Sequence, residues 1–427
     1  MNDEQVNSLE KVRLSFQIWR RRFFVFLVVI GPGLITAVAD NDAGGVATYT
    51  VVASMFGNAA QLLIIPTIVL LAITQNIGAR IAVVTRKGLG DLIRERYGIK
   101  ISMLVFFLYY IVNQGVVLQN ISGLKASYQL FNLPWQLLLA LTSLFLILFV
   151  VNFDYRRIQR IFLLLIFFYI SYVIAAFLSK PNWGEVVKET LLPQKINLGL
   201  SYWFSLVAVL GTTITAWGQF FVSSYIKDKK LSIDHLRYEK LEVYSGALIT
   251  SFFSFMIVTA VAQTLFAHHI LVSDGQTAAL ALRPLAGDLT FVLFASGLFG
   301  ASILGLTIVP LATAYVFSEL FGYEGSLDTN FKKGRLFYSF FSLQIIVGLI
   351  IALIPQVSLF KLTLYVDFLN GAMLPLIFFF LIKFAESKEI MGYHVLNKFE
   401  RIFIRGAAVL ITLAVIISFT GRIFHII

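Results

Sequence analysis

Two acidic residues lie inside the first long apolar stretch of the chain, where charge is least expected. This stretch, residues 23–57, reads FFVFLVVIGPGLITAVADNDAGGVATYTVVASMFG, and Asp40 and Asp42 fall near its middle. About 20 apolar residues suffice for a helix to cross a bilayer, and each acid at its centre costs about 2.5–3.5 kcal/mol on insertion scales. Gly44 and Gly45 follow directly and weaken a helix. The segment therefore predicts a polar site on a broken membrane helix, because irregular backbone at that depth must face protein or a water-filled cavity.

The composition places the whole chain in a membrane. Of its 427 residues, 58% are hydrophobic and 13% charged, against about 25% charged in a typical soluble domain. Basic loops at a membrane surface explain the net charge of +11 better than nucleic-acid binding does. The absence of cysteine excludes disulfides and thiolate metal ligands. No nucleotide-binding loop and no zinc-protease motif occurs, so we expect neither an ATP-driven pump nor an enzyme, and no cofactor.

Eleven apolar segments of spanning length follow one another along the chain. They lie near 23–56, 59–85, 101–124, 134–152, 158–179, 200–226, 241–267, 289–321, 335–355, 360–384 and 402–424. Most of the 34 lysines and arginines fall in alternate connections, which places those connections and the N-terminal segment 1–22 in the cytoplasm. We therefore expect a multi-pass protein of the plasma (inner) membrane, without a cleavable signal peptide, whose C-terminus is extracellular or periplasmic.

The sixth span carries a second interruption. Residues 207–228 read VAVLGTTITAWGQFFVSSYIKD, with small and polar residues in mid-membrane. Spans one and six match in position if the chain is two five-span repeats, about 23–179 and 200–384, followed by an extra helix at about 402–424. Such a pair is typical of an inverted-repeat transporter whose site lies at the midplane between discontinuous helices. We therefore expect an all-α membrane protein with a single transporter domain, residues 23–427.

Asp42 is the first candidate ligand of the site. A carboxylate beside an unwound turn is a hard oxygen donor suited to a cation. The same side chain could cap the helix that follows by accepting backbone N–H bonds, and the two roles are compatible. Asp40 would face elsewhere on a regular helix, but an unwound segment could bring both carboxylates to one ion. It either attracts or hydrates the cation or is a polar residue of an aqueous vestibule.

The polar residues of the sixth span are weaker candidates. Thr212 and Thr215 offer hydroxyls and, at a break, free carbonyls, although a single membrane threonine usually bonds its own helix. Gln219 could orient water or bond a neighbouring helix. Asp367 in the tenth span is a further intramembrane acid, near the ion path or paired internally. Most other membrane amides are expected to join helices, and they are Gln75, Asn76, Asn113, Gln114, Gln119, Asn120, Gln263 and Gln344.

The chain resembles the NRAMP family of divalent-metal transporters over about residues 24–425. The resemblance is sharpest in GPGLITAVADNDAGGVATY, residues 31–49, and in IGARIAVVTRKGLGDLIRERY, residues 77–97. It implies a LeuT-like fold of two inverted five-helix repeats, with eleven transmembrane helices and one ion site made by helices one and six.

Departures from the family pattern bear on the substrate. The first-helix motif Asp-Pro-Gly-Asn reads Asp-Ala-Gly-Gly here, so Asp42 keeps the acid while Gly45 replaces the Asn ligand. The helix-six motif Met-Pro-His reads Thr-Ala-Trp from Thr215, and the carbonyl-donating position corresponds to Thr212. A thioether selects softer transition metals, whereas an all-oxygen site suits Mg²⁺, Ca²⁺ or Mn²⁺. The lost ligands leave room for the waters that Mg²⁺ retains.

The residues linked to proton movement in the family also differ. The helix-six histidine is replaced, and the helix-three acids fall near Val116 and Gln119. The pattern resembles the NRAMP-related magnesium transporters of prokaryotes, which implies uptake of partly hydrated Mg²⁺, and of Mn²⁺, by alternating access without proton coupling. The alternatives are a proton-coupled Mn²⁺/Fe²⁺ transporter and a Na⁺-coupled amino-acid carrier on the same fold. The expected partners are the divalent cation and the lipid bilayer, with no nucleic acid and no obligate protein partner.

Overall fold

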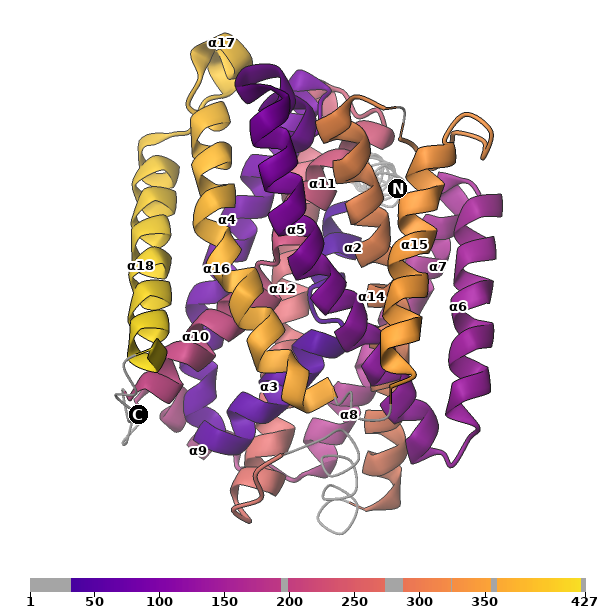
Figure 1. The fold of residues 1–427 in the computed structure, drawn as a ribbon. Helices are drawn as coiled ribbons and strands as arrows, with labels where there is room; N and C mark the ends of the chain where they lie inside the picture. The colour runs from indigo at the N-terminus through magenta and orange to yellow at the C-terminus, as the bar shows by residue number, and fades with distance from the viewer. Residues whose placement is uncertain (1–31, 193–198, 273–286, 324, 355–358, 424–427) are drawn as a thin grey trace, which may run out of the picture.

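The computed structural model describes residues 32–192, 199–272, 287–323, 325–354 and 359–423, and these form a bundle of helices (Figure 1). In chain order the α-helices are α2 (Pro32–Ala39), α3 (Ala43–Phe56), α4 (Gln61–Thr85), α5 (Leu89–Leu130), α6 (Trp135–Asn152), α7 (Tyr155–Leu165), α8 (Ile170–Leu178), α9 (Trp183–Leu191), α10 (Leu200–Thr213), α11 (Ala216–Asp228), α12 (Leu236–Val261), α14 (Asp288–Phe321), α15 (Arg335–Ala352), α16 (Leu359–Ala385), α17 (Lys388–Met391) and α18 (Lys398–Ile423).

Every predicted span contains helix in the described part of the chain. Ten stretches there are long and apolar enough to cross a membrane, and one of them, Ala43–Thr85, joins the end of the first predicted span to the second. The segment 1–22 and the start of the first span, residues 23–31, lie outside the described residues. The division into two repeats with the boundaries given above stays a prediction.

Two spans are broken at the predicted places. The first is interrupted between α2 and α3, where Asp42 has an extended backbone with φ −63° and ψ −171°. The sixth is interrupted between α10 and α11, where Ile214 has φ −113° and ψ 41° and Thr215 begins the next helix. These non-helical residues are fully buried, so the backbone groups they release face protein, as a membrane interior requires.

Helix α5 is longer than its predicted span because it contains a kink. Gly98 has φ 75° and ψ 178°, a conformation that side chains with a Cβ rarely adopt. The predicted span 101–124 lies after this kink, and the short arm from Leu89 to Tyr97 lies before it. That arm carries the second half of the family-like stretch 77–97 and lies at the end of the bundle, whereas residues 77–85 belong to α4.

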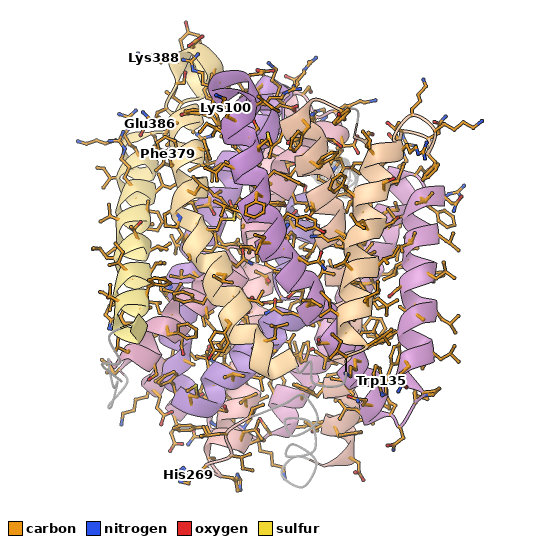
Figure 2. All side chains as sticks on the ribbon, in the orientation of Figure 1. Lys100, Trp135, His269, Phe379, Glu386 and Lys388 are labelled. Atoms are coloured by element: carbon orange, nitrogen blue, oxygen red, sulfur yellow. The ribbon has the colours of Figure 1, made fainter. Side chains whose placement is uncertain are left out.

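The outer surface of the bundle is apolar along its helices. Phe107 on α5, Phe145 on α6 and Leu410 on α18 are each more than 60% exposed. A soluble protein rarely leaves so many large apolar side chains on one continuous surface. Charged residues instead gather at the ends: Figure 2 shows Lys100, Glu386 and Lys388 at one end and His269 at the other. We call the end that carries Lys100, Lys388 and α17 the basic end.

Candidate metal site

Asp42 makes hydrogen bonds that stabilise the break between α2 and α3. Its Oδ1 accepts a hydrogen bond from the Gly45 N–H at 3.1 Å, and its carbonyl oxygen accepts one from the Val46 N–H at 2.9 Å. Asn120 of α5 donates from Nδ2 to Asp42 Oδ2 at 2.6 Å and accepts the Ala43 N–H at 3.2 Å. Asp42 is therefore the N-cap of α3. A carboxylate has about four lone-pair sites, so two accepted bonds leave it able to bind a cation.

Asp40 connects the two broken helices. Thr215 donates from Oγ1 to Asp40 Oδ1 at 2.7 Å, and the same hydroxyl caps α11 by accepting the Gly218 N–H at 2.9 Å. Gln75 of α4 donates to the other oxygen, Oδ2, at 3.1 Å. The structure thus places Asp40 and Thr215 in direct contact, and both side chains are buried.

Gly45 and Thr212 lie close to each other across the two breaks. A Cβ atom built on Gly45 would lie 2.9 Å from the carbonyl oxygen of Asp40 and 3.4 Å from Thr212 Oγ1. Even a methyl group at this position would therefore be too close to the Asp40 carbonyl oxygen, so the close approach of the two breaks requires glycine here.

A third buried acid, Asp367 of α16, lies beside these residues. Thr48 of α3 donates to its Oδ2 at 2.5 Å, and Gln119 of α5 donates from Nε2 to its Oδ1 at 3.1 Å. The Thr212 hydroxyl also hydrogen-bonds this carboxylate. Asp367 therefore joins α3, α5 and α10 to its own helix, α16. It also interacts electrostatically with Asp42.

The side-chain amide of Gln119 places its oxygen close to Gly44 and Asp42. Its Nε2 donates to Asp367 and to the carbonyl oxygen of Thr363 at 3.1 Å, and both of these partners only accept. Its Oε1 is buried without a hydrogen-bond partner among the described residues. A Cβ built on Gly44 would lie 2.7 Å from that oxygen and 3.1 Å from Asp42 Oδ1. Oε1 is therefore a buried acceptor close to Gly44 and to the Asp42 carboxylate, and a nearby cation or water would supply the partner that the described residues do not.

The remaining polar residues of the two breaks have other partners. Asn41 donates to the carbonyl oxygen of Thr250 on α12 at 2.7 Å, which ties the first break to that helix. Asn370 of α16 accepts the Ala216 N–H at 2.7 Å, at the start of α11. Gln219 is fully buried, but neither end of its amide has a hydrogen-bond partner in the described part of the chain. The structure therefore gives Gln219 no direct contact with Asp42.

The site is rich in negative charge and oxygen atoms. No lysine, arginine or histidine among the described residues forms an ion pair with Asp40, Asp42 or Asp367. Within those residues no group of three or more histidine, cysteine, aspartate or glutamate side chains has a metal-binding arrangement. A cation here would therefore take its remaining ligands from hydroxyl, amide and backbone oxygens or from water. Such ligands suit hard cations.

Sequence reasoning missed part of the site. Gln75, Gln119 and Asn120 join helices as predicted, but their partners are the three acids, which the sequence alone did not indicate. Thr48 was not considered as a partner of Asp367. A usable signal was the run of three polar residues Gln114, Gln119 and Asn120 on one membrane helix, although it does not say which helix they face.

Comparisons with known proteins identify similar sequences and folds. The family model described as natural resistance-associated macrophage protein-like, Nramp, matches residues 33–420. The divalent metal cation transporter MntH of Staphylococcus haemolyticus is 25% identical over 260 residues, which cover 59% of this chain and 57% of that protein. The match thus spans less than two thirds of that relative.

Solved structures share the architecture. A variant of the Eremococcus coleocola manganese transporter superposes with a TM-score of 0.73 at 20% identity, over 94% of this chain and 88% of that one. MhsT in complex with L-phenylalanine superposes with a TM-score of 0.58 at 15% identity, over 91% of this chain and 98% of that one. These likenesses show a common fold, and the predicted all-α, LeuT-like fold class is confirmed.

Proposed function

Because the chain belongs to the Nramp family, we propose that it transports divalent metal cations across the membrane, with Mg²⁺ as its main substrate and Mn²⁺ as a second one. The MntH relative is by name a divalent metal cation transporter, and the structural neighbour is by title a manganese transporter. Transport of a divalent cation is the part of the proposal that rests on both the family and the site.

The oxygen donors around Asp42 carry the preference for Mg²⁺. The central observation is that Gln119 Oε1 and Asp42 Oδ1 both lie close to Gly44, and that the described residues supply no hydrogen-bond donor to Oε1. Asp42 would bind the ion, Thr212 and Thr215 would supply hydroxyl oxygens, and Asp40 would add charge through Thr215. Mg²⁺ usually binds one or two carboxylates and keeps several waters, so it does not need a complete protein cage.

The ligand that is absent at Gly45 supports a partly hydrated ion. Glycine offers no side-chain oxygen where the family motif has asparagine, so water can take the place of that protein ligand. No methionine lies in α10 or α11, so the two halves of the sixth span offer no thioether to a soft metal. An all-oxygen environment favours Mg²⁺ and Mn²⁺ over the softer transition metals. Gln219 stays a weaker candidate, acting through water.

Transport is proposed to run without proton coupling. The helix-three acids of the family fall near Val116 and Gln119, neither of which titrates, and the Gln119 amide donates to Asp367. An inside-negative potential favours entry of each positive charge by about 2.3 kcal/mol per 100 mV. That driving force is doubled for a divalent ion. The proposed orientation places the basic end in the cytoplasm, as the distribution of lysine and arginine predicts.

Flux in liposomes tests the proposal. Purified protein should carry Mg²⁺ and Mn²⁺ down a concentration gradient, and a membrane potential should accelerate the flux. Asp42→Ala should abolish the flux. Asp154→Asn should not, because Asp154 is an exposed N-cap residue of α7. Mg²⁺ entry without acidification of the lumen is expected. Acidification that accompanies Mg²⁺ entry would overturn the uncoupled mechanism, and full transport by Asp42→Ala would overturn the site.

A proton-coupled Mn²⁺ carrier is the second candidate. The observation that favours it is the third buried acid, Asp367, which interacts with Asp42. Competition decides between the two candidates: Mg²⁺ in millimolar excess should suppress Mn²⁺ uptake by a magnesium transporter and leave it unchanged in a manganese carrier. The fold shared with MhsT carries no such argument for amino-acid transport, because the likeness concerns the fold alone.

A further inference from the structure

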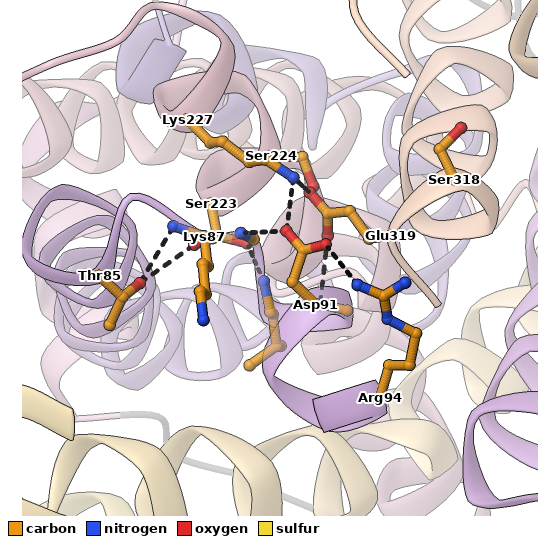
Figure 3. Close-up of polar contacts among 12 residues, drawn as sticks. Thr85, Lys87, Asp91, Arg94, Ser223, Ser224, Lys227, Ser318 and Glu319 are labelled. Atoms are coloured by element: carbon orange, nitrogen blue, oxygen red, sulfur yellow. Dashed lines mark hydrogen bonds and ion pairs between the residues drawn. The ribbon is translucent and has the colours of Figure 1, made fainter. Parts of the chain in front are cut away.

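A buried charge cluster lies at the basic end of the bundle, far along the chain from the metal site. Lys227, at the end of α11, lies 2.5 Å from Asp91 Oδ2 of α5 and 3.6 Å from Glu319 Oε1 of α14 (Figure 3). Glu319 is 3% exposed and Asp91 13% exposed, so both carboxylates are largely shielded from solvent. One lysine thus holds two acids from two other helices.

The short arm of α5 is shaped around this cluster. The Gly90 N–H donates to Glu319 Oε2 at 3.2 Å, and the Gly88 N–H donates to Asp91 Oδ2 at 3.0 Å. A Cβ built on Gly88 would overlap the Glu319 carboxylate. These residues belong to the second half of the family-like stretch 77–97, and their hydrogen-bond partners lie in the cluster rather than at the metal site. The cluster gives that stretch a physical role.

The neighbouring residue of α11 is anchored as well. Asp228 accepts hydrogen bonds from the hydroxyls of Tyr315 and Ser326, and from the Leu327 N–H at 3.0 Å. The last two residues of α11 are therefore both fixed to the α14 side of the bundle. On its other side, Asp91 is bordered by Arg94, which lies 3.8 Å from Asp91 Oδ1 (Figure 3).

Helix α11 links this cluster to the metal site. It is 13 residues long and begins at the cap Thr215, whose hydroxyl donates to Asp40, and it ends next to Lys227. Helix α11 therefore begins at the predicted ion site and ends in the charge cluster. A helix of this length moves as a rigid body, so releasing its Lys227 end also allows its Thr215 end to move.

We propose that Lys227, Asp91 and Glu319 form a latch that closes the pathway from the metal site to the basic end, with Lys227 as a positioning residue for transport. The inference rests on the proposed function, because a latch needs a pathway to close. The lysine neutralises two buried acids only while α11 packs against α5 and α14. When the helix moves away, the two shielded carboxylates must regain water or other partners, so the latch favours the closed state.

The chain contains no cysteine, so a single engineered cysteine can report on the latch. Val38, near the end of α2 and two residues before Asp40, is fully buried, whereas Tyr393, which follows α17 at the basic end, is fully exposed. Val38→Cys serves as the reporter, and Tyr393→Cys shows from which face of a vesicle a membrane-impermeant maleimide reaches the basic end. The measurement is the labelling rate of Val38→Cys from that face.

Lys227→Met should raise this rate about tenfold, because the open state gains population when the buried acids lose their cation. Lys227→Arg should keep it low. Lys230→Met is the matched control, since Lys230 is exposed near the same helix end and should leave the rate unchanged. Glu319→Gln offers a second route to a weakened latch if Lys227→Met does not fold. An unchanged rate in both Lys227→Met and Glu319→Gln would overturn the latch.

The labelling readout separates the latch from the proposed function. A protein that carries no Mg²⁺ yet shows the rise with Lys227→Met has the latch but not the proposed substrate. A protein that carries Mg²⁺ yet shows no rise has the substrate but not the latch. A purely structural role for Lys227 would lower thermal stability without a rise in labelling, and that outcome also counts against the proposal.

Discussion

Thr215 donates a hydrogen bond to Asp40 at 2.7 Å, and this one contact joins the break in the first span to the break in the sixth. The two residues are far apart in the sequence, and each belongs to a non-helical segment that a membrane interior tolerates only when its polar groups find partners. The same threonine hydroxyl accepts the Gly218 N–H and so begins α11. Movement of α11 is therefore transmitted directly to the acidic segment.

Removing the Thr215 hydroxyl should weaken both the cap and the bridge. We expect Thr215→Val to lower the free energy of unfolding by about 1–3 kcal/mol, the usual cost of losing a cap and leaving a buried acceptor unpaired. Thr215→Ser should retain most of the stability. Thermal unfolding in detergent measures this, and a double-mutant cycle with Asp40→Asn should show coupling of the two changes. Additive effects would mean that the bond contributes nothing.

Gly45→Ala should impair transport and lower stability. The added Cβ would lie 2.9 Å from the carbonyl oxygen of Asp40, closer than carbon and oxygen normally approach, and 3.4 Å from Thr212 Oγ1. We expect Mg²⁺ uptake to fall about tenfold, because the backbone beside Asp40 and Asp42 must shift to admit the methyl group. Gly406→Ala on α18 is the control, because no heavy atom lies within 4 Å of a Cβ built there. Equal effects of the two substitutions would exclude a special role for Gly45.

Asp367→Asn should weaken Mg²⁺ uptake less than Asp42→Asn does. Asp367 already accepts hydrogen bonds from Thr48 and Gln119, so its charge acts on the ion mainly from a distance. We expect the concentration of Mg²⁺ at half-maximal uptake to rise severalfold with Asp367→Asn, while the maximal rate stays within about twofold. Radiotracer or fluorescent-indicator uptake over a range of Mg²⁺ concentrations separates these quantities. A complete loss of the maximal rate would place Asp367 in direct contact with the ion.

Asn120→Ala should destabilise the first break. Asn120 both donates to Asp42 Oδ2 and accepts the Ala43 N–H, so its loss leaves two buried groups without a partner. We expect about 2–4 kcal/mol less stability from the two lost bonds. Added Mg²⁺ should restore part of the thermal stability if the ion binds the freed carboxylate oxygen, because a ligand that binds the folded state raises its stability. Thermal unfolding with and without Mg²⁺ tests this, and an identical shift with Na⁺ at equal ionic strength would contradict it.

Much of the architecture could be predicted from local sequence. The helical spans follow from runs of apolar residues, since a backbone in hydrocarbon must satisfy its own hydrogen bonds. The two breaks follow from acids, threonines and glycines inside such runs, and α3 and α11 begin at Asp42 and Thr215 as N-caps. The kink at Gly98 was missed, because a single glycine inside a helical pattern does not by itself indicate a bend.

The sequence by itself determined that this is a membrane bundle with two interrupted helices and acids at one of the interruptions. Apolar periodicity and the cost of burying charge are local quantities that one segment reveals. Only the tertiary structure decided that Asp40 faces Thr215, that Gln119 turns its amide oxygen toward Asp42, and that Lys227 joins Asp91 to Glu319. Each of these contacts joins different helices, and which face of a helix meets which neighbour depends on the packing of the whole bundle.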